Sequence, residues 1–469
     1  MLRLHELICA CLTCARAGGL RKLGPIDWAA VFLFLAQFWS GLSGLLTVAV
    51  VAARLGVDEQ GYYYTFGSVL AMQVFVELGL ATVLVQFASH EWSHLKLAAD
   101  GTIVGQMSAI SRLASLLKFA VKWYIVAGFL LSFALALCGG FVFSGTKSPS
   151  ASVHWQMPWL VLCLVVGSAL TLTPFFAILE GCGQIVSVSL FRLLQAFLGS
   201  IAILLCFWYG IGLYSVAVGA AVRLFVGLIF VLIAQRRFIS TLLWHHVIEK
   251  IAWKDSIWPF QWRIAVSWLS GYFIYSLFTP VMFMYHGAVV AGQMGMTLTL
   301  VGAIETLAYP WVLSKAPQFG ALIATNRYVE LDSLFRRRIV FALSVGIAVG
   351  VAVISVRPIA GWLGWRVEGR LLGWMPLLVF VFQRMLIVSA SAIAVYVRAH
   401  KRDPLMIPSV VSALLIGVLT FVLGKPYGPE GVAVGYLAVT VFWILPASCW
   451  VFARVRREWH VPDSVPLEP

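Results

Sequence analysis

Long apolar stretches recur about twelve times along the chain, each near the ~20 residues that a helix needs to cross the hydrocarbon core of a bilayer. Hydrophobic residues make up 61% of the 469 positions and charged residues only 11%. We therefore expect an all-α polytopic membrane protein without a folded soluble domain. The expected spans are 28–53, 62–88, 119–143, 156–179, 185–209, 213–234, 256–285, 294–313, 339–356, 373–399, 405–423 and 431–453.

The distribution of positive charge between these spans predicts the orientation. With the N-terminus in the cytoplasm, the cytoplasmic segments carry 22 of the 33 Lys and Arg residues and the opposite segments carry 6. This asymmetry follows the positive-inside rule and favours an even number of spans with both termini cytoplasmic. The net charge of +14 is thus mainly a sign of topology, and we do not expect a nucleic-acid partner.

The two halves of the chain resemble each other weakly. Gly56 and Gly61 follow the first span, and Gly287 and Gly292 follow the seventh with the same spacing; in each half the next span contains a single glutamate. Internal repeats of this kind are common in transporters. We expect two six-helix bundles around a central cavity, at 27–240 and 241–453. A cytoplasmic N-terminal segment at 1–26 and a cytoplasmic tail at 454–469 flank them.

Two cytoplasmic segments carry smaller patterns. Cys9, Cys11 and Cys14 cluster in the N-terminal segment, where we expect no special role, with lipidation and a partial metal site as alternatives. Apolar residues recur at helical spacing over 103–117 with serines and an arginine between them. This pattern predicts an amphipathic helix on the membrane surface.

Five cations lie inside the expected spans, where each charge costs roughly 2.5–3.5 kcal/mol at the bilayer centre on insertion scales. Lys122 lies near a cytoplasmic span end and can extend to the interface, so anchoring is as good an explanation as function. Arg192 and Arg263 lie about two turns inside their spans, and Arg223 and Arg384 lie near the middle. Guanidinium groups suit phosphate oxygens, so we predict that these five residues line a cavity for an anionic substrate.

The carboxylates inside the spans are fewer. Glu77 and Glu305 lie within spans, and Glu180 lies at a span edge, which leaves a surplus of positive charge. Glu77 and Glu305 could bind a coupling proton or sodium ion, or could act as fixed counter-ions. In the second case Arg223 or Arg384 would pair with one of them and hold helices together.

The string His90-Glu91-Trp92-Ser93-His94 has the H-E-x-x-H pattern of zinc hydrolases. On one helix, this spacing places two imidazoles on the same face beside a general-base glutamate. The string lies where the second span enters the cytoplasm, and no third ligand stands out. We expect an interfacial helix end and no metal or other cofactor, with zinc bound by His90 and His94 as the alternative.

Three stretches resemble the polysaccharide flippases of the multidrug/oligosaccharidyl-lipid/polysaccharide exporter superfamily. They are A-R-L-G-V-D-E-Q-G-Y-Y-Y-T-F (53–66), E-L-G-L-A-T-V-L-V-Q (77–86) and L-E-G-C-G-Q (179–184) followed by Arg192. The resemblance implies two six-helix bundles that open alternately to each face of the membrane. It also implies that cavity cations hold the pyrophosphate of a polyprenyl-linked sugar chain, a role we assign by position to Arg192, Arg223, Arg263 and Arg384.

The resulting expectation is a non-enzymatic flippase of the bacterial inner membrane. It would move a polyprenyl-pyrophosphate-linked oligosaccharide by alternating access for surface polysaccharide biosynthesis. The expected partners are this substrate, membrane lipids and other polysaccharide assembly proteins. An ion-coupled multidrug exporter of the same superfamily is one alternative, although it should favour acidic cavity residues. An intramembrane zinc metalloprotease that uses the H-E-x-x-H string is the other.

Overall fold

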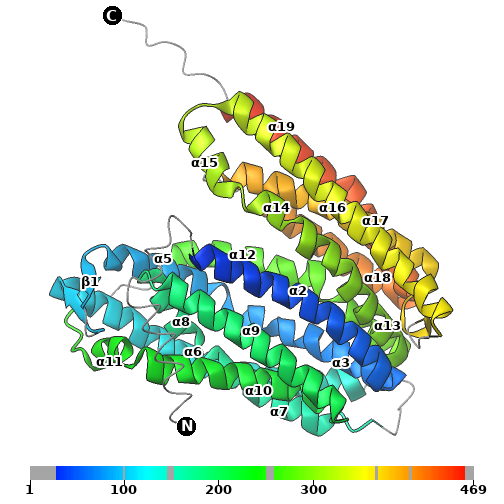
Figure 1. Ribbon diagram of the computed structural model, residues 1–469, viewed down its shortest axis with the longest axis horizontal. Helices are drawn as coiled ribbons and strands as arrows, with labels where there is room; N and C mark the ends of the chain where they lie inside the picture. Colours follow the sequence, from blue (N-terminus) through cyan, green and yellow to red (C-terminus); the bar gives the residue numbers. More distant parts are fainter. Residues whose placement is uncertain are drawn as a thin grey trace, which may run out of the picture. The chain divides into compact units, whose positions relative to one another are not determined.

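The computed structural model describes residues 28–98, 101–144, 153–249, 258–364, 368–400 and 404–459. These residues form two compact units, and each unit is built from several separate segments of the chain (Figure 1). Unit 1 holds 28–43, Met72–Gly140 and His154–Trp268, and unit 2 holds Gly44–Ala71, 141–144 and 269–459. The expected division into bundles at residue 240 stays a prediction. The N-terminal cysteines lie outside the described residues.

Unit 1 is built from helices and one short hairpin. Its elements are part of α2 (Trp28–Arg54), α4 (Val74–Glu77), α5 (Leu80–Trp92), β1 (Leu95–Leu97), β2 (Ile103–Gly105), most of α6 (Met107–Ser144), α7 (Gln156–Leu170), α8 (Thr173–Gly181), α9 (Ile185–Trp208), α10 (Tyr214–Ile229), a π-helical turn (Phe230–Ala234), α11 (Arg236–Trp244) and part of α12 (Trp258–Tyr275). The strands β1 and β2 pair antiparallel, with Leu95 opposite Gly105.

Unit 2 consists of helices joined by turns and short connections, within its described residues. Its elements are the end of α2, α3 (Val57–Leu70), the end of α6, the end of α12, α13 (Phe278–Ala308), α14 (Pro310–Leu313), α15 (Ala316–Ala324), α16 (Tyr328–Trp362), a 3-10 turn (Glu368–Arg370), α17 (Trp374–Arg398), α18 (Met406–Val439), a second π-helical turn (Thr440–Ile444) and α19 (Leu445–Trp459).

The expectation of an all-α polytopic protein is confirmed. Nine helices or helix runs of the described chain are long and apolar enough to cross a membrane, or ten if the bent pair Val57–Glu77 and Leu80–Trp92 forms one span. Two runs, Ile264–Ala324 and Met406–Trp459, contain 61 and 54 residues. Each can cross twice, since glycines break their helices at Gly287 and Gly428. About twelve crossings therefore fit the described residues.

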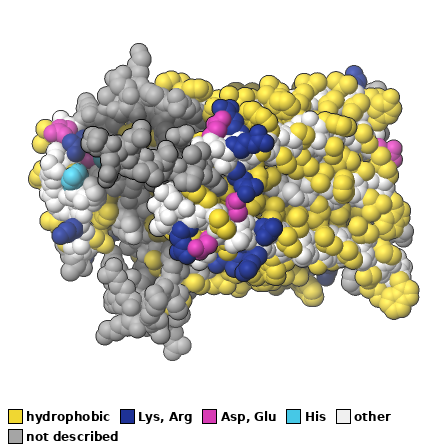
Figure 2. All heavy atoms as spheres, turned by 90° about the horizontal axis from the view of Figure 1, so that it is seen from above, with side chains coloured by type: hydrophobic (Ala, Val, Ile, Leu, Met, Phe, Trp, Pro, Cys, Tyr) yellow, Lys and Arg dark blue, Asp and Glu magenta, His cyan; other side chains and the backbone are white. Residues whose placement is uncertain are grey.

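The surface carries the apolar side chains expected of a protein embedded in a bilayer. Figure 2 shows one face on which hydrophobic side chains form a broad band, with Lys, Arg, Asp and Glu side chains gathered at one edge of it.

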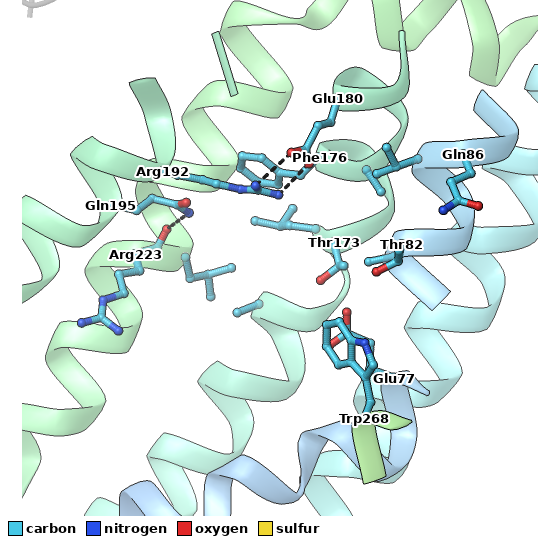
Figure 3. A pocket seen from close by; sticks show the side chains of 16 residues that line it. Glu77, Thr82, Gln86, Thr173, Phe176, Glu180, Arg192, Gln195, Arg223 and Trp268 are labelled. Carbon is cyan, nitrogen blue, oxygen red and sulfur yellow. Dashed lines mark hydrogen bonds and ion pairs between the residues drawn. The ribbon is translucent and has the colours of Figure 1, made fainter. Parts of the chain in front are cut away.

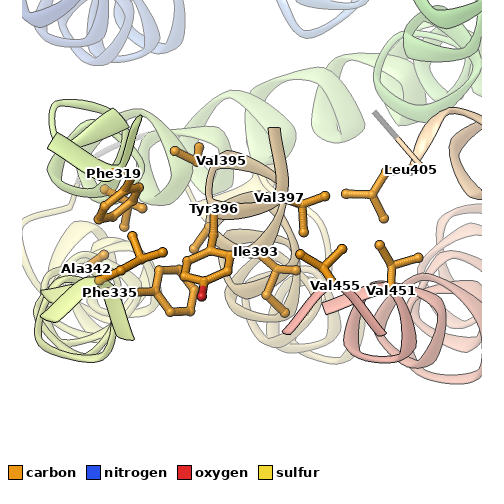
Figure 4. Close-up of a cluster of buried hydrophobic side chains, with 13 residues drawn as sticks. Phe319, Phe335, Ala342, Ile393, Val395, Tyr396, Val397, Leu405, Val451 and Val455 are labelled. Carbon is orange, nitrogen blue, oxygen red and sulfur yellow. The ribbon is translucent and has the colours of Figure 1, made fainter. Parts of the chain in front are cut away.

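Within unit 2, aromatic and branched side chains of α15, α16, α17 and α19 form a tight core around Tyr396 (Figure 4). The Tyr396 hydroxyl donates a hydrogen bond to Asp332 Oδ1 over 2.6 Å, which satisfies the one polar atom of that side chain.

The prediction of an amphipathic surface helix over 103–117 is wrong. Residues 103–105 form β2, and the remainder begins α6, a continuous helix of 38 residues. Its apolar face lies inside the protein, since Ile110, Leu113 and Leu117 are at most 5% exposed. The pattern marks one end of a long apolar helix packed against protein, and packing of this kind produces the same periodicity as a lipid surface.

Candidate functional site: a polar cavity in unit 1

The second span is broken beside one of the intramembrane carboxylates. Leu78 and Gly79 both adopt left-handed backbone conformations (φ 50° and 66°), so α4 ends at Glu77 and α5 starts at Leu80. A side chain at Gly79 would place its Cβ 2.4 Å from Cγ2 of Ile264 on α12. Glu77 thus stands at a helix terminus, where backbone carbonyls lose their intrahelical partners. Discontinuous helices of this kind form substrate and ion sites in transporters.

A cavity of about 650 Å³ lies in unit 1 with Glu77 in its wall (Figure 3). Polar side chains from α5, α8 and α9 face it, together with one indole from α12. The lining residues are Glu77, Ala81, Thr82, Val85, Gln86, Ala169, Leu172, Thr173, Phe176, Ala177, Glu180, Arg192, Gln195, Arg223, Leu224 and Trp268. The volume is typical of small-molecule sites, which span roughly 300–1,000 Å³.

One arginine of this cavity is held by a bidentate ion pair. Arg192 on α9 donates from Nη1 and Nη2 to the two carboxylate oxygens of Glu180 on α8, over 3.1 and 2.8 Å. The left-handed Gly183 turns the chain between these helices, which brings residues twelve apart in sequence together. Their side chains are 43% and 23% exposed, so the pair is open to the cavity. It can donate and accept hydrogen bonds while adding no net charge.

Arg223 takes part in the cavity differently. Its backbone carbonyl accepts a hydrogen bond from Nε2 of Gln195 over 2.9 Å. Its guanidinium points away from Arg192 and Glu77 in Figure 3. The side chain crosses α9 at Gly199, where an added Cβ would lie 2.5 Å from Arg223 Nε. The missing side chain at Gly199 therefore leaves the space that the Arg223 side chain occupies.

The remaining predicted cations lie elsewhere. Lys122 is exposed on α6, and the side chain of Arg263 lies outside the described residues. Arg384 belongs to unit 2, where Nη1 donates to Oε2 of Glu305 over 2.8 Å. The structure therefore places Arg192, Arg223 and Glu77 in one cavity wall, and it places Arg384 and Glu305 in an ion pair of the other unit. The pairing is the arrangement foreseen for counter-ions, while the substrate and coupling roles stay predictions.

Several lining residues were not singled out by the sequence analysis. Thr82 and Gln86 lie one turn apart on α5, and Gln195 lies one turn after Arg192. The sequence did carry one signal for such lining residues, which is a polar residue one helical turn from a charge inside an expected span, as Gln195 is from Arg192. Trp268 was not singled out either; its side chain is 41% exposed and lines the cavity together with Glu77 (Figure 3).

The H-E-x-x-H string does not form the helical zinc motif. Helix α5 ends at Trp92, so His94 lies beyond the helix that carries His90. Glu91 is engaged, since its Oε2 accepts a hydrogen bond from Nε of Arg112 over 2.9 Å. Arg112 also reaches Glu249 over 2.9 Å and so ties α5 to the segment after α11. Within the residues that the structure describes, no group of three His, Cys, Asp or Glu side chains could hold a metal ion.

We expect Glu91→Gln to lower the free energy of unfolding by no more than about 1 kcal/mol, since the Arg112 side chain is 32% exposed and glutamine keeps an acceptor for it. A zinc chelator should likewise leave the unfolding temperature of the purified protein unchanged. Metal analysis of the purified protein provides the control. Stoichiometric zinc that is lost in His90→Ala would contradict this interpretation.

Comparison with known proteins identifies the fold. No protein-family model matches the chain, and no curated protein matches it in sequence. Among solved structures, an inward-facing multidrug resistance MATE family transporter of the MOP superfamily matches with a TM-score of 0.64 and 11% identity, over 95% of this chain and 99% of that chain. The lipid II flippase MurJ, in an inward closed conformation, matches with a TM-score of 0.56 and 16% identity, over 92% and 94%.

A third structure matches with a TM-score of 0.51 and 12% identity, over 92% of this chain and 94% of that chain. It is a MOP superfamily transporter from Pyrococcus furiosus, described by the reversed polarity of its binding pocket. The three likenesses extend over nearly the whole chain. They show that this multi-pass membrane protein has the fold of MOP superfamily transporters.

Proposed function

We propose that the protein is a flippase that moves a polyprenyl-pyrophosphate-linked oligosaccharide across the bacterial inner membrane, with both termini in the cytoplasm. Surface polysaccharide assembly would use the translocated product, and membrane lipids and other assembly proteins would be its partners. Alternating access needs no covalent step, so the protein's task is to bind the polar head and shield it from the hydrocarbon.

The polar cavity of unit 1 is the observation that carries this proposal. Sugar rings present hydroxyl groups on their edges and C–H groups on their faces. Gln86, Gln195 and the Arg192–Glu180 pair offer both donors and acceptors to hydroxyl groups. The indole of Trp268 offers a flat apolar surface for a ring face. Such a wall suits a carbohydrate better than a purely apolar compound.

Arg192 and Arg223 are the cations of the cavity lining that an anionic end of the substrate could use. Glu180 already occupies Arg192, so a pyrophosphate would have to compete for that guanidinium or use the surplus donors of its fork. We propose Arg192 as a contact for the phosphate groups in unit 1, joined by Arg223 once its guanidinium turns toward the cavity, with Arg263, Arg384 and Lys122 as the other cations of the transport path. Glu77 at the helix break is the candidate site for a coupling ion, and Glu305 is the counter-ion of Arg384.

A deletion strain tests this function. We expect it to accumulate completed lipid-linked oligosaccharide, measured by mass spectrometry of extracted lipids. Wild type should clear this pool. Trp268→Leu and Arg192→Gln should each reduce clearance at least about tenfold, which corresponds to 1.4 kcal/mol of lost binding or transition-state stabilisation. Trp262→Leu, the same change on α12 outside the cavity wall, is the matched control and should clear normally.

An ion-coupled multidrug exporter is the second candidate function. It is favoured by the MATE likeness and by the two carboxylates, Glu77 and Glu180, in the cavity wall. It predicts unchanged lipid pools in the deletion strain together with raised sensitivity to cationic dyes. Normal lipid pools with intact surface polysaccharide would overturn the flippase proposal in favour of this one.

A further inference from the structure

Unit 2 contains a second polar pocket that the proposed function does not use. Its volume is about 190 Å³, and its polar lining comes from α12, α17, α18 and α19. The residues that supply this lining are Tyr275, Ser391, Arg398, Ser409, Ser412 and Ser448. Four serine hydroxyls, one phenol hydroxyl and one guanidinium thus gather around one small space.

The pocket follows a polar stripe of α17. Arg384, Ser391 and Arg398 are spaced seven residues apart, so they lie on one face of the helix about 10 Å from one to the next at 1.5 Å per residue. Arg384 is 7% exposed and is paired with Glu305. Its guanidinium carbon lies 5.7 Å from the ring centre of Tyr275, which also lines the pocket. Arg398 is exposed in the last turn of α17 and brings the positive charge of the pocket itself.

The serine hydroxyls are placed to bind an additional group. Ser409 and Ser412 donate to carbonyls of their own helix, at Leu405 and Pro408, over 2.9 and 2.7 Å, so their oxygens are fixed at the pocket wall. Ser448 is different, because it is only 7% exposed and makes no hydrogen bond to another described residue. The Ser448 hydroxyl is therefore available to donate a hydrogen bond to a ligand in the pocket.

The charge of the pocket selects an anion. None of its thirteen lining residues, all within the described chain, is an aspartate or glutamate. The cavity of unit 1 differs, since its lining includes the carboxylates of Glu77 and Glu180. The N-terminus of the long helix α18 also meets the pocket at Leu405, and no side chain caps it. A guanidinium has five N–H donors, so Arg398 can hold an oxyanion alongside its other contacts.

We propose that this pocket is a phosphate-binding site of unit 2, formed by Arg398 with the hydroxyls of Ser391 and Ser448. The ligand is a phosphate group, either free in the cytoplasm or carried by a lipid head. Arg398 supplies a forked pair of donors to two phosphate oxygens, and the serines donate to the remaining ones. The site does not depend on the substrate proposed above, because it rests on the lining of this pocket alone.

Thermal unfolding of the purified full-length protein in detergent, titrated with inorganic phosphate, tests the site. We expect phosphate to raise the unfolding temperature of wild type. Arg398→Gln and Ser448→Ala should each weaken the apparent affinity at least about fivefold. The control variant Arg337→Gln removes one arginine charge at an exposed position of α16 outside the pocket. Its unfolding temperature should respond to phosphate like that of wild type. Ser448→Ala keeps the test valid if Arg398→Gln does not fold.

Nanodiscs separate the two sources of phosphate. Stabilisation by phosphatidylglycerol relative to phosphatidylcholine, lost in Arg398→Gln and Ser448→Ala but kept in Arg337→Gln, would assign the site to a lipid head. Stabilisation by inorganic phosphate alone would assign it to a free phosphate group. Equal responses of Arg398→Gln and Arg337→Gln to both probes, or no response of wild type to either, would overturn the proposal. Neither result bears on clearance of lipid-linked oligosaccharide, so the two proposals can fail separately.

Discussion

Replacing Gly61 with alanine should lower the unfolding temperature of the purified protein sharply and reduce its yield in the membrane. A Cβ at Gly61 on α3 would lie 2.0 Å from the carbonyl oxygen of Ala288 on α13, and 2.5 Å from its carbonyl carbon. These are backbone atoms of a packed helix, so no side-chain rotation can relieve the overlap. Overpacking costs about 1–3 kcal/mol where side chains can adjust, and we expect at least the upper end here.

Gly67→Ala provides a matched control on the same helix. A Cβ at Gly67 would meet nothing within 4 Å. Alanine is favoured over glycine inside a helix by roughly 0.5–1 kcal/mol, so this variant should be as stable as wild type or more so. Equal stability of Gly61→Ala and Gly67→Ala would contradict the close crossing of α3 and α13.

The second large effect concerns the ion pair between Arg384 and Glu305. The two side chains are 8% and 25% exposed, so breaking the pair leaves a charge in a poorly solvated interior. Removing one partner of a buried pair costs about 3–5 kcal/mol. We expect Glu305→Met to be worse than Arg384→Met, because a lone carboxylate can take up a proton whereas a guanidinium stays charged.

The double variant Arg384→Met with Glu305→Met completes this test. It removes both charges and replaces them with side chains that pack well, so we expect it to recover most of the stability lost in either single variant. Free energies of unfolding of all four proteins, measured in one detergent, give the coupling free energy. Additive losses in the double variant would show that the two charges do not depend on each other.

Much of the fold was predictable because hydropathy reports directly on contact with lipid. The breaks at Gly287 and Gly428 fall between expected spans, at 285–294 and 423–431. The break at Leu78 and Gly79 falls inside an expected span and was missed. A leucine in a left-handed conformation is held there by its surroundings, against a local cost of roughly 1–2 kcal/mol, so local sequence does not reveal it.

The glycine repeat had structural meaning that the sequence did not disclose. Gly61 and Gly292 were matched as equivalent positions of two halves. In unit 2 they pack against each other, since a Cβ at Gly292 would lie 2.9 Å from the backbone nitrogen of Gly61. Small residues let membrane helices approach closely. Equivalent positions of a repeat can meet in space, and only the structure shows that these do.

The candidate site was predictable in part. Intramembrane charges indicated Glu77, Arg192 and Arg223, and all three line one cavity. The sequence could not show that Glu180 neutralises Arg192, or that Arg384 pairs with a glutamate 79 residues away. Pairing decides which cations are available to a substrate, and it depends on contacts between helices distant in sequence. The expected surplus of positive charge is therefore absent from the described wall of the unit 1 cavity, where Glu180 pairs with Arg192, Glu77 adds a second carboxylate and the Arg223 guanidinium points away from both Arg192 and Glu77.

Translocation by the purified protein tests the central claim most directly. Proteoliposomes would contain a fluorescent polyprenyl-pyrophosphate-linked oligosaccharide, and an impermeant quencher added outside would report the fraction in each leaflet. We predict that wild type and Trp262→Leu bring the inner-leaflet lipid within reach of the quencher within minutes, and that Trp268→Leu does so at least about tenfold more slowly. Equal rates in protein-free vesicles and in vesicles with wild type would contradict the account.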